Sequence, residues 1–239
     1  MNHHSFRKIS KQTRFERDDV FKFQKMRTSA KQAKIQKTGI QAQKSNGGTI
    51  SDKREAILRA AIKVFAQKGY FNSKVADIAK EAGIADGTVY LYFKSKDEIL
   101  HSIFDRAMEE FISEGKREIA EITEVEKRLR RIAELHLERL GADRDLAVVF
   151  QVELRGSTKF MEEFSGGGFA EYLDIIKKTV EEGQKANVFR RDLKAITAAK
   201  ILYGALDEMV TNWVLSKRAY PLAPMADEVL KIFFGGIIK

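Results

Sequence analysis

The stretch VADIAKEAGIADGTVYLYFKSK at residues 75–96 decides the fold. Its apolar spacing predicts a short helix over about residues 74–82. The inward positions of that helix are Val75, Ile78, Ala79 and Ala82. Gly83 interrupts the pattern, because glycine adopts the left-handed turn geometry that a residue with Cβ resists. A second helix is predicted from Asp86 through Phe93. Two short helices around such a turn indicate a helix-turn-helix.

The residues before this stretch predict one more helix. Apolar residues recur there at helical spacing along one face: Ile57, Ala60, Ala61, Val64 and Phe65. Asp52 and Glu55 are predicted to cap the start of this helix, and Gly69 is predicted to end it.

The residues that close the stretch bear on function. Ser95 and Glu98 match the S-x-x-E capping box, which predicts a new helix at this point. Lys96 then lies in the first turn, where the helix dipole disfavours a cation unless an anion is near. A DNA phosphate would be that anion. The alternative is an ordinary helical hairpin whose tyrosines cap the core, and it explains Lys96 less well.

Recognition helices enter the major groove of DNA and present mainly their N-terminal residues to base edges. Tyrosine hydroxyls can also donate to phosphates, which fixes the register of the protein on DNA rather than its sequence preference. The predicted DNA-binding residues are Ser73, Lys74, Asp86, Gly87, Thr88, Tyr90, Leu91, Tyr92 and Lys96.

Residues 57–69 (ILRAAIKVFAQKG) together with residues 75–96 closely resemble the DNA-binding domain of TetR-family transcriptional regulators. The resemblance covers residues 51–239. It implies an all-α fold, with a three-helix DNA-binding domain over 51–97 and a helical effector-binding and dimerisation domain over 98–239. Residues 1–50 have no counterpart in a typical member of the family.

Composition and charge narrow the remaining classes. The chain has 239 residues, 44% hydrophobic and 32% charged, and no cysteine. It is therefore globular, without disulfides or cysteine-ligated metals. No apolar run is long enough for a membrane span and no secretory signal precedes the fold, which predicts a cytoplasmic protein of bacterial type, associated with the nucleoid when bound to DNA, with no membrane partner.

The net charge of +9 belongs to residues 1–50, which hold twelve of the 43 Lys and Arg and only three of the 34 Asp and Glu. These residues show no sustained apolar period, which predicts a disordered basic arm that adds sequence-independent affinity for DNA. A short amphipathic helix around Phe15 and Phe21 is the alternative. The sequence leaves open whether the arm belongs to the native protein.

The second domain is predicted to be all-helical. An apolar stripe marks the helix that leaves the DNA-binding domain: Ile99, Leu100, Ile103, Phe104, Ala107, Met108, Phe111 and Ile112. Further helices are predicted at about 124–141, 145–155, 158–165, 169–186, 192–217 and 223–237. Gly166, Gly167 and Gly168 separate two of them, and Pro224 suits the first turn of the last.

Polar residues inside these apolar helices are candidates for an effector site. Each taken alone is more often a satisfied polar group of the core or surface. Gln151, Glu153 and Asn212 belong to this wider set. The predicted effector-binding residues are Phe104, Met108, His136, Arg139, Phe150, Arg155, Tyr172, Tyr203 and Asp207. His136 with Glu153 is no metal site, because two widely separated residues are not a ligand set.

Residues 146–155 (LAVVFQVELR) and 207–214 (DEMVTNWV) resemble the acyl-CoA-responsive regulators of fatty-acid degradation from bacilli. This closer resemblance implies an apolar tunnel for an acyl chain and basic groups at its mouth for the phosphates. Arg139, Arg144 and Arg155 are the candidates for those groups. Long-chain acyl-CoA is the implied effector, release from DNA is the implied response, and no cofactor is required.

The last two predicted helices are apolar on more than one face, which favours burial against a second copy of the chain. The alternative is a core helix of a monomer. By the family resemblance these helices pair into a four-helix bundle across a two-fold axis. The predicted dimer contacts are Leu206, Val210, Trp213, Val229, Phe233 and Ile237.

The sequence thus predicts a homodimeric repressor that binds a palindromic double-stranded operator and leaves it when a large apolar effector binds. An enzyme is not expected, because the chain holds no GxxxxGK[ST], HExxH or GxSxG motif. Two alternatives remain: a TetR-type regulator of an efflux or other metabolic operon with a different hydrophobic ligand, and an architectural protein that binds nucleic acid through the arm alone.

Overall fold

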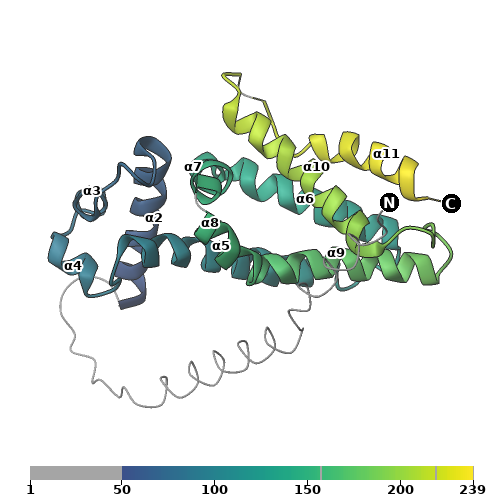
Figure 1. The fold of residues 1–239 in the computed structure, drawn as a ribbon, viewed down its shortest axis with the longest axis horizontal. Helices are drawn as coiled ribbons and strands as arrows, with labels where there is room; N and C mark the ends of the chain where they lie inside the picture. Colours follow the sequence, from purple (N-terminus) through teal and green to yellow (C-terminus); the bar gives the residue numbers. More distant parts are fainter. Residues whose placement is uncertain (1–49, 157, 219, 239) are drawn as a thin grey trace, which may run out of the picture. The chain divides into compact units, whose positions relative to one another are not determined.

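The computed structural model describes residues 50–156, 158–218 and 220–238 (Figure 1). The predicted basic arm over residues 1–50 lies outside this range except for Ile50. Every regular element in the described residues is a helix, and the only strand-like feature among them is an isolated antiparallel bridge between Phe189 and Ile238. The all-α prediction is confirmed. No helix in the described residues is long and apolar enough to cross a bilayer.

Three helices form the predicted DNA-binding domain, which is called the head below: α2 (Ile50–Lys68), α3 (Val75–Glu81) and α4 (Asp86–Tyr90). Gly69 ends α2 at φ +78°, and Gly83 turns the chain after α3 at φ +68°. Both are left-handed conformations, as predicted. The predicted cap at Asp52 is wrong, because α2 already includes Ile50 and Asp52 lies inside its first turn.

The recognition helix α4 is shorter than predicted. It ends at Tyr90, and the chain then tightens, with Leu91 N donating to Thr88 O at 3.2 Å and Tyr92 N donating to Val89 O at 3.0 Å. This turn brings Phe93 into the core, where it is buried. Phe93 N also donates to Val89 O at 3.0 Å, so the two buried side chains lie on the same side of the chain.

The regular elements of the second domain are all helical in its described residues. In chain order they are α5 (Lys96–Ile119), α6 (Val125–Ala142), α7 (Arg144–Val148), η1 (Val149–Glu153), η2 (Leu154–Gly156), α8 (Thr158–Ser165), α9 (Gly168–Lys185), α10 (Ala195–Leu215) and α11 (Met225–Ile237). Five of these helices, α6, α8, α9, α10 and α11, lie within three residues of their predicted bounds. Pro224 precedes α11 as its N-cap and is not in its first turn.

The helix predicted over 145–155 is helical along its whole length, but it is not a single α-helix. The segment divides into a short α-helix, one π-helical turn (η1) and one 3-10 turn (η2). Short π segments often mark functional sites and have poorer packing than an α-helix. Residues 149–156, which comprise η1 and η2, are called the bridge segment below.

Two hydrophobic cores hold the fold together. The head core contains the buried residues of α2–α4, the first half of α5 and three residues of later elements: Val149, Leu154 and Phe160. The effector core is built from α6, α9, α10 and α11 with Met108 and Ile112 of α5. Phe150 and Phe164 pack against both cores. The head core therefore extends past the predicted boundary between residues 97 and 98.

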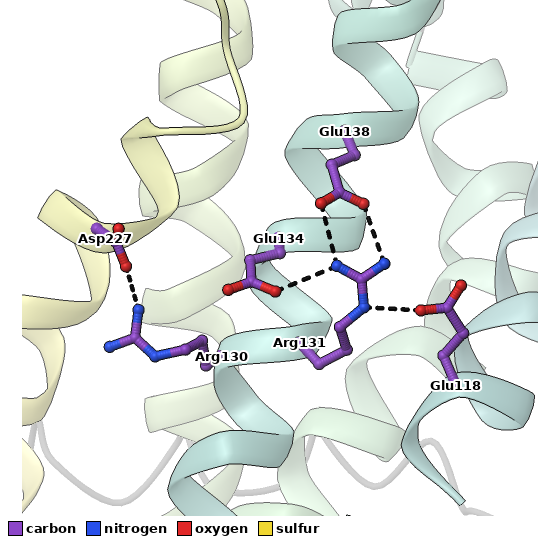
Figure 2. A network of polar contacts seen from close by, with 6 residues as sticks. All are labelled: Glu118, Arg130, Arg131, Glu134, Glu138 and Asp227. Atoms are coloured by element: carbon purple, nitrogen blue, oxygen red, sulfur yellow. Dashed lines mark hydrogen bonds and ion pairs between the residues drawn. The ribbon is translucent and has the colours of Figure 1, made fainter.

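Ion pairs on α6 tie the effector domain together (Figure 2). Arg131 donates to Glu118 of α5 at 2.7 Å and to Glu138 at 3.0 Å, and these hydrogen bonds hold the pKa of its guanidinium above the ordinary value. The neighbouring Arg130 pairs with Asp227 of α11. Figure 2 shows the two arginines reaching to opposite sides of α6, so this one helix is linked to both α5 and α11.

Candidate DNA-binding surface and effector pocket

The outer face of α4 carries side chains that the head core does not use. Val89 points inward and is fully buried, whereas Tyr90 is 56% and Leu91 82% exposed. Asp86 and Gly87 are exposed as well, while Thr88 and Tyr92 are half-buried. Large exposed apolar and aromatic side chains next to each other indicate a contact surface.

Two of the predicted DNA contacts are already used inside the head. Ser73 is buried, because its hydroxyl donates to Gly69 O at 2.7 Å. Lys96 donates through Nζ to Tyr70 O at 2.6 Å and to Ser73 O at 2.8 Å, and Nζ lies 4.4 Å from the centroid of the Tyr70 ring. Lys96 therefore does not need an external anion, because carbonyl oxygens of the α2–α3 turn accept hydrogen bonds from its ammonium group.

The start of α5 also differs in detail from the predicted capping box. Ser95 Oγ accepts from Glu98 N at 3.1 Å, as expected for an N-cap. The Glu98 carboxylate, however, accepts from Lys94 N at 2.6 Å instead of Ser95 N. Lys74 remains exposed, and its backbone N–H donates to Asp77 at 2.9 Å at the start of α3.

A predominantly apolar pocket lies in the effector domain and has an empty volume of about 1010 Å³, its opening to solvent included. Residues of α5, α6, α7, the bridge segment, α8, α9 and α10 line it. Eight of the nine predicted effector residues are among them, all except Phe104. Phe104 lies behind the wall, where its ring meets Phe150 edge-on at 4.7 Å between centroids.

Sequence reasoning missed other lining residues. They are Ala107, Phe111, Leu140, Leu146, Gln151, Leu154, Met161, Phe164, Ser165 and Phe169, of which Gln151 belonged to the wider set. Most are apolar and look like core positions in the sequence. Helical spacing could have found three of them, since Phe111 follows Met108, Leu140 follows His136 and Phe169 precedes Tyr172 by three or four residues.

A polar cluster occupies one wall of the pocket. Gln151 Nε2 donates to Asp207 Oδ1 at 2.7 Å, and Arg155 pairs with the other carboxylate oxygen of Asp207. Thr211 Oγ1 donates to Gln151 Oε1 at 2.9 Å. Asp207 is buried, so these bonds compensate a carboxylate removed from water.

His136 and Tyr172 form a second polar pair in the pocket wall. Nδ1 of His136 lies 3.1 Å from the Tyr172 hydroxyl. Burial lowers the pKa of His136 to about 4, with the Asp207 charge acting in the opposite direction. Burial likewise raises the pKa of the Tyr172 hydroxyl. Both groups are therefore neutral at pH 7.

Of the three arginines predicted at the mouth, two line the pocket. Arg139 is exposed and pairs with Glu114, and Arg155 is 42% exposed and pairs with Asp207. Arg144 is not at the pocket. Its guanidinium lies over the Trp213 ring and donates to Val214 O at 2.7 Å, so it caps the end of α10 instead.

Two further candidates have structural partners elsewhere. The Glu153 carboxylate accepts from Tyr70 N in the head at 2.6 Å, and Asn212 bonds Glu208 at 2.7 Å on the surface of α10. Among the described residues, no three His, Asp or Glu side chains are grouped as metal ligands.

The six predicted dimer contacts offer little surface to a partner chain. All six, Leu206, Val210, Trp213, Val229, Phe233 and Ile237, are buried in the core of one chain. The exposed apolar residues of α10 and α11 are different ones: above all, Ile201 at 59% and Ile232 at 79% exposed lie within the helices, and Leu215 at 71% is the last residue of α10. A Cβ added at Gly204, Gly235 or Gly236 would meet no atom within 4 Å, so these helices offer flat, open backbone beside the two isoleucines.

Comparisons with known proteins agree with this architecture. Residues 57–103 match the family described as "Bacterial regulatory proteins, tetR family", and residues 104–236 match the "YsiA-like protein, C-terminal region". The fatty acid metabolism regulator protein of Bacillus subtilis is 36% identical over 181 residues, which span 76% of this chain and 93% of the relative.

Two solved structures are similar over most of their length. The fatty acid degradation regulator FadR from Bacillus halodurans has a TM-score of 0.74 at 35% identity, covering 81% of this chain and 98% of that one. The regulator FadR from Bacillus subtilis in complex with stearoyl-CoA has a TM-score of 0.72 at 34% identity, covering 76% and 98%. These relatives are transcriptional regulators and not enzymes.

Proposed function

The chain belongs to the TetR family of bacterial transcriptional regulators, and from this premise we propose that it is a repressor that leaves its operator when a long-chain acyl-CoA binds. The observation that carries the proposal is the apolar pocket of the effector domain, with polar groups on its wall and Arg139 and Arg155 among its lining residues. The similar regulator from Bacillus subtilis was solved with stearoyl-CoA, which supports this ligand class.

DNA contact is assigned to the outer face of α4. Tyr90 and Leu91 are exposed for base edges, with Asp86, Gly87 and Thr88 at the start of the helix. Lys74, exposed at the start of α3 as its N-cap, is assigned to a DNA phosphate. Ser73 and Lys96 shape the head from within. Tyr92, half-buried, keeps the role of a phosphate contact through its hydroxyl.

A palindromic operator requires two heads, and we assign the dimer surface to Ile201 and Ile232 with the open glycines of α10 and α11. Half-sites should then lie ~34 Å apart, or a multiple of it. The test is the mass in solution by light scattering. Ile232→Arg should give a monomer, because a buried unpaired charge opposes association. Phe71→Arg, at an exposed apolar residue of the head, is the matched control and should stay dimeric.

Two elements can carry the effector signal to the head. The helix α5 contributes to both cores, and the bridge segment does the same over a shorter path. Gln151 and Arg155 of that segment bond Asp207 in the pocket, while Glu153 between them bonds Tyr70 N in the head. An effector phosphate that draws Arg155 from Asp207, or an acyl chain that repacks Phe150, would shift the segment that holds Tyr70.

The function is tested by titrating the protein–operator complex with acyl-CoAs of increasing chain length, beside the free acids and CoA alone. We expect release that grows with chain length and needs the CoA moiety. A coupling of ~1–3 kcal/mol corresponds to a roughly 5–150-fold loss of DNA affinity. Release by another hydrophobic ligand alone would favour a regulator of an efflux or other operon.

Footprinting tests the alternative of an architectural protein. A repressor protects one palindrome, whereas binding through residues 1–50 alone would give diffuse protection. Deleting residues 1–45 should flatten the salt dependence of binding, because each neutralised phosphate contributes about 0.9 to the logarithmic slope, yet it should leave operator choice intact. Loss of the preferred site in the truncated protein would show that the arm reads sequence.

A further inference from the structure

One buried hydrogen-bonding group in the pocket wall has no use in the protein. His136 is buried and lines the pocket, and its Nε2 has no hydrogen-bond partner in the described part of the chain. Aromatic rings surround it: Tyr172 is stacked at 5.8 Å between centroids, and Tyr203 and Phe111 meet it edge-on at 6.0 and 6.3 Å. An unsatisfied buried polar group of this kind requires an explanation.

The neighbouring hydroxyl decides the character of Nε2. Tyr172 is buried and its hydroxyl lies 3.1 Å from Nδ1 of His136. A hydroxyl carries one proton to donate, and a neutral imidazole carries its proton on one of its two nitrogens. We assign the Tyr172 hydroxyl as the donor to Nδ1, because in the other tautomer its own proton would have no acceptor among the described residues; the imidazole proton then resides on Nε2. His136 then presents an uncharged N–H donor at the pocket wall.

Among the described residues, no acceptor bonds this nitrogen. Asp207 is the one carboxylate that lines the pocket in this part of the chain, and Gln151 and Arg155 already donate to its two oxygens. Leaving a buried donor unpaired costs ~1–3 kcal/mol, and a ligand that supplies the missing acceptor recovers this free energy. The pocket is therefore shaped for a ligand that is apolar for most of its length and carries one acceptor beside His136.

We propose that His136 Nε2–H donates a hydrogen bond to an uncharged carbonyl oxygen of the acyl-CoA effector and so fixes how far its acyl chain enters the pocket. This inference rests on the proposed function. A carboxylate on the ligand would be a poor acceptor here, because the negative charge of Asp207 lies in the same wall and would repel it. Arg155 already pairs with Asp207 and does not neutralise a second carboxylate. The carbonyl can be that of the thioester or of an amide in the pantetheine arm.

The experiment compares palmitoyl-CoA with S-hexadecyl-CoA, a thioether that lacks the thioester carbonyl and keeps the amides. Dissociation constants are measured by calorimetry for the wild-type protein, His136→Phe and His136→Gln. Phe keeps the aromatic wall and removes the donor, while Gln keeps an N–H donor in a similar place. We expect His136→Phe to bind palmitoyl-CoA about tenfold more weakly and His136→Gln to recover part of the loss.

The thioether identifies the carbonyl. If the thioester is the acceptor, the wild-type protein binds S-hexadecyl-CoA about tenfold more weakly than palmitoyl-CoA, and His136→Phe does not distinguish the two. If a pantetheine amide is the acceptor, the wild-type protein binds both equally and His136→Phe weakens both. Either result supports the donor role of His136.

Other results overturn the inference. Equal affinity of wild-type protein and His136→Phe for palmitoyl-CoA would show that the donor makes no bond to the ligand. A loss in His136→Phe that His136→Gln shares in full would assign His136 to packing alone. If the wild-type protein binds neither compound, the proposed effector itself is wrong, and the inference fails with it.

Discussion

The DNA-binding surface and the effector pocket expose their polar groups in opposite ways. On the outer face of α4, Tyr90 and Asp86 are exposed to solvent, where a binding partner can reach them. In the pocket, Asp207 and Tyr172 are buried and bonded to neighbouring side chains. A substitution on the surface should therefore change binding and leave stability intact, whereas one in the pocket should change both.

The largest expected effect of this difference is a loss of folding stability at acid pH, caused by the buried His136. Its pKa is about 4 in the folded protein against about 6.5 when unfolded, so only the unfolded state takes up a proton between these values. Stability is complete above pH 6.5 and is lost as the pH falls toward 4, by roughly 3 kcal/mol.

Urea unfolding at pH 7 and pH 4.5 tests this expectation. The wild-type protein should lose roughly 2–3 kcal/mol more than His136→Phe over this interval, because the variant has no imidazole to protonate. Tyr90→Ala, on the DNA-binding surface, should keep the wild-type response. An equal loss in His136→Phe would mean that other groups carry the acid sensitivity.

The next largest effect is expected at the surface. Tyr90→Ala should weaken operator binding ~10–100-fold, since a base-edge contact is worth about 1–3 kcal/mol. Its unfolding free energy should stay within about 0.5 kcal/mol of the wild-type value, because the side chain is exposed. Tyr220→Ala removes an exposed tyrosine outside the head and serves as the control. Unchanged affinity of Tyr90→Ala would remove α4 from the interface.

Lys74 and Lys96 repeat the contrast within the head. Lys96→Met removes the two hydrogen bonds from Nζ to the backbone carbonyls of Tyr70 and Ser73. It should therefore lower the unfolding free energy by about 1.5 kcal/mol. Lys74→Met should leave stability unchanged and reduce the logarithmic salt slope of DNA binding by about 0.9. A reduced salt slope in Lys96→Met would instead restore its role as a phosphate contact.

The smallest effect is expected where the two regions meet. Glu153→Ala removes the acceptor for Tyr70 N, so the ratio of DNA affinities without and with acyl-CoA should fall by roughly 5-fold, about 1 kcal/mol of coupling. Val152→Ala, at the neighbouring exposed position, is the control. If the ratio is the same in both variants, the signal travels through α5 alone.

Local signals predicted much of the fold and of the pocket. The left-handed turns at Gly69 and Gly83 and the N-cap at Ser95 depend on neighbouring residues only, so they could be found in the sequence. The buried polar residues His136 and Asp207 could be found as well, because a polar side chain within an apolar helix needs a partner or a ligand.

Contacts between distant residues could not be predicted in this way. Lys96 is held by carbonyls of Tyr70 and Ser73, and Arg144 by carbonyls at the end of α10, about 70 residues away. A lysine or arginine carries the same charge whether a phosphate or a backbone carbonyl faces it. The sequence shows the cation, and only the folded chain shows its acceptor.

The sequence by itself determined that the described part of the chain is all-α, that Gly69 and Gly83 turn the chain in the head, and that α10 and α11 are apolar on more than one face. Only the tertiary structure decided which face is inside: Phe233 is buried, whereas Ile232, its neighbour in the chain, is 79% exposed. The physical reason is that the hydrophobic effect is proportional to buried area and has no direction, so composition predicts burial while packing against α6 and α10 chooses the inward face of α11.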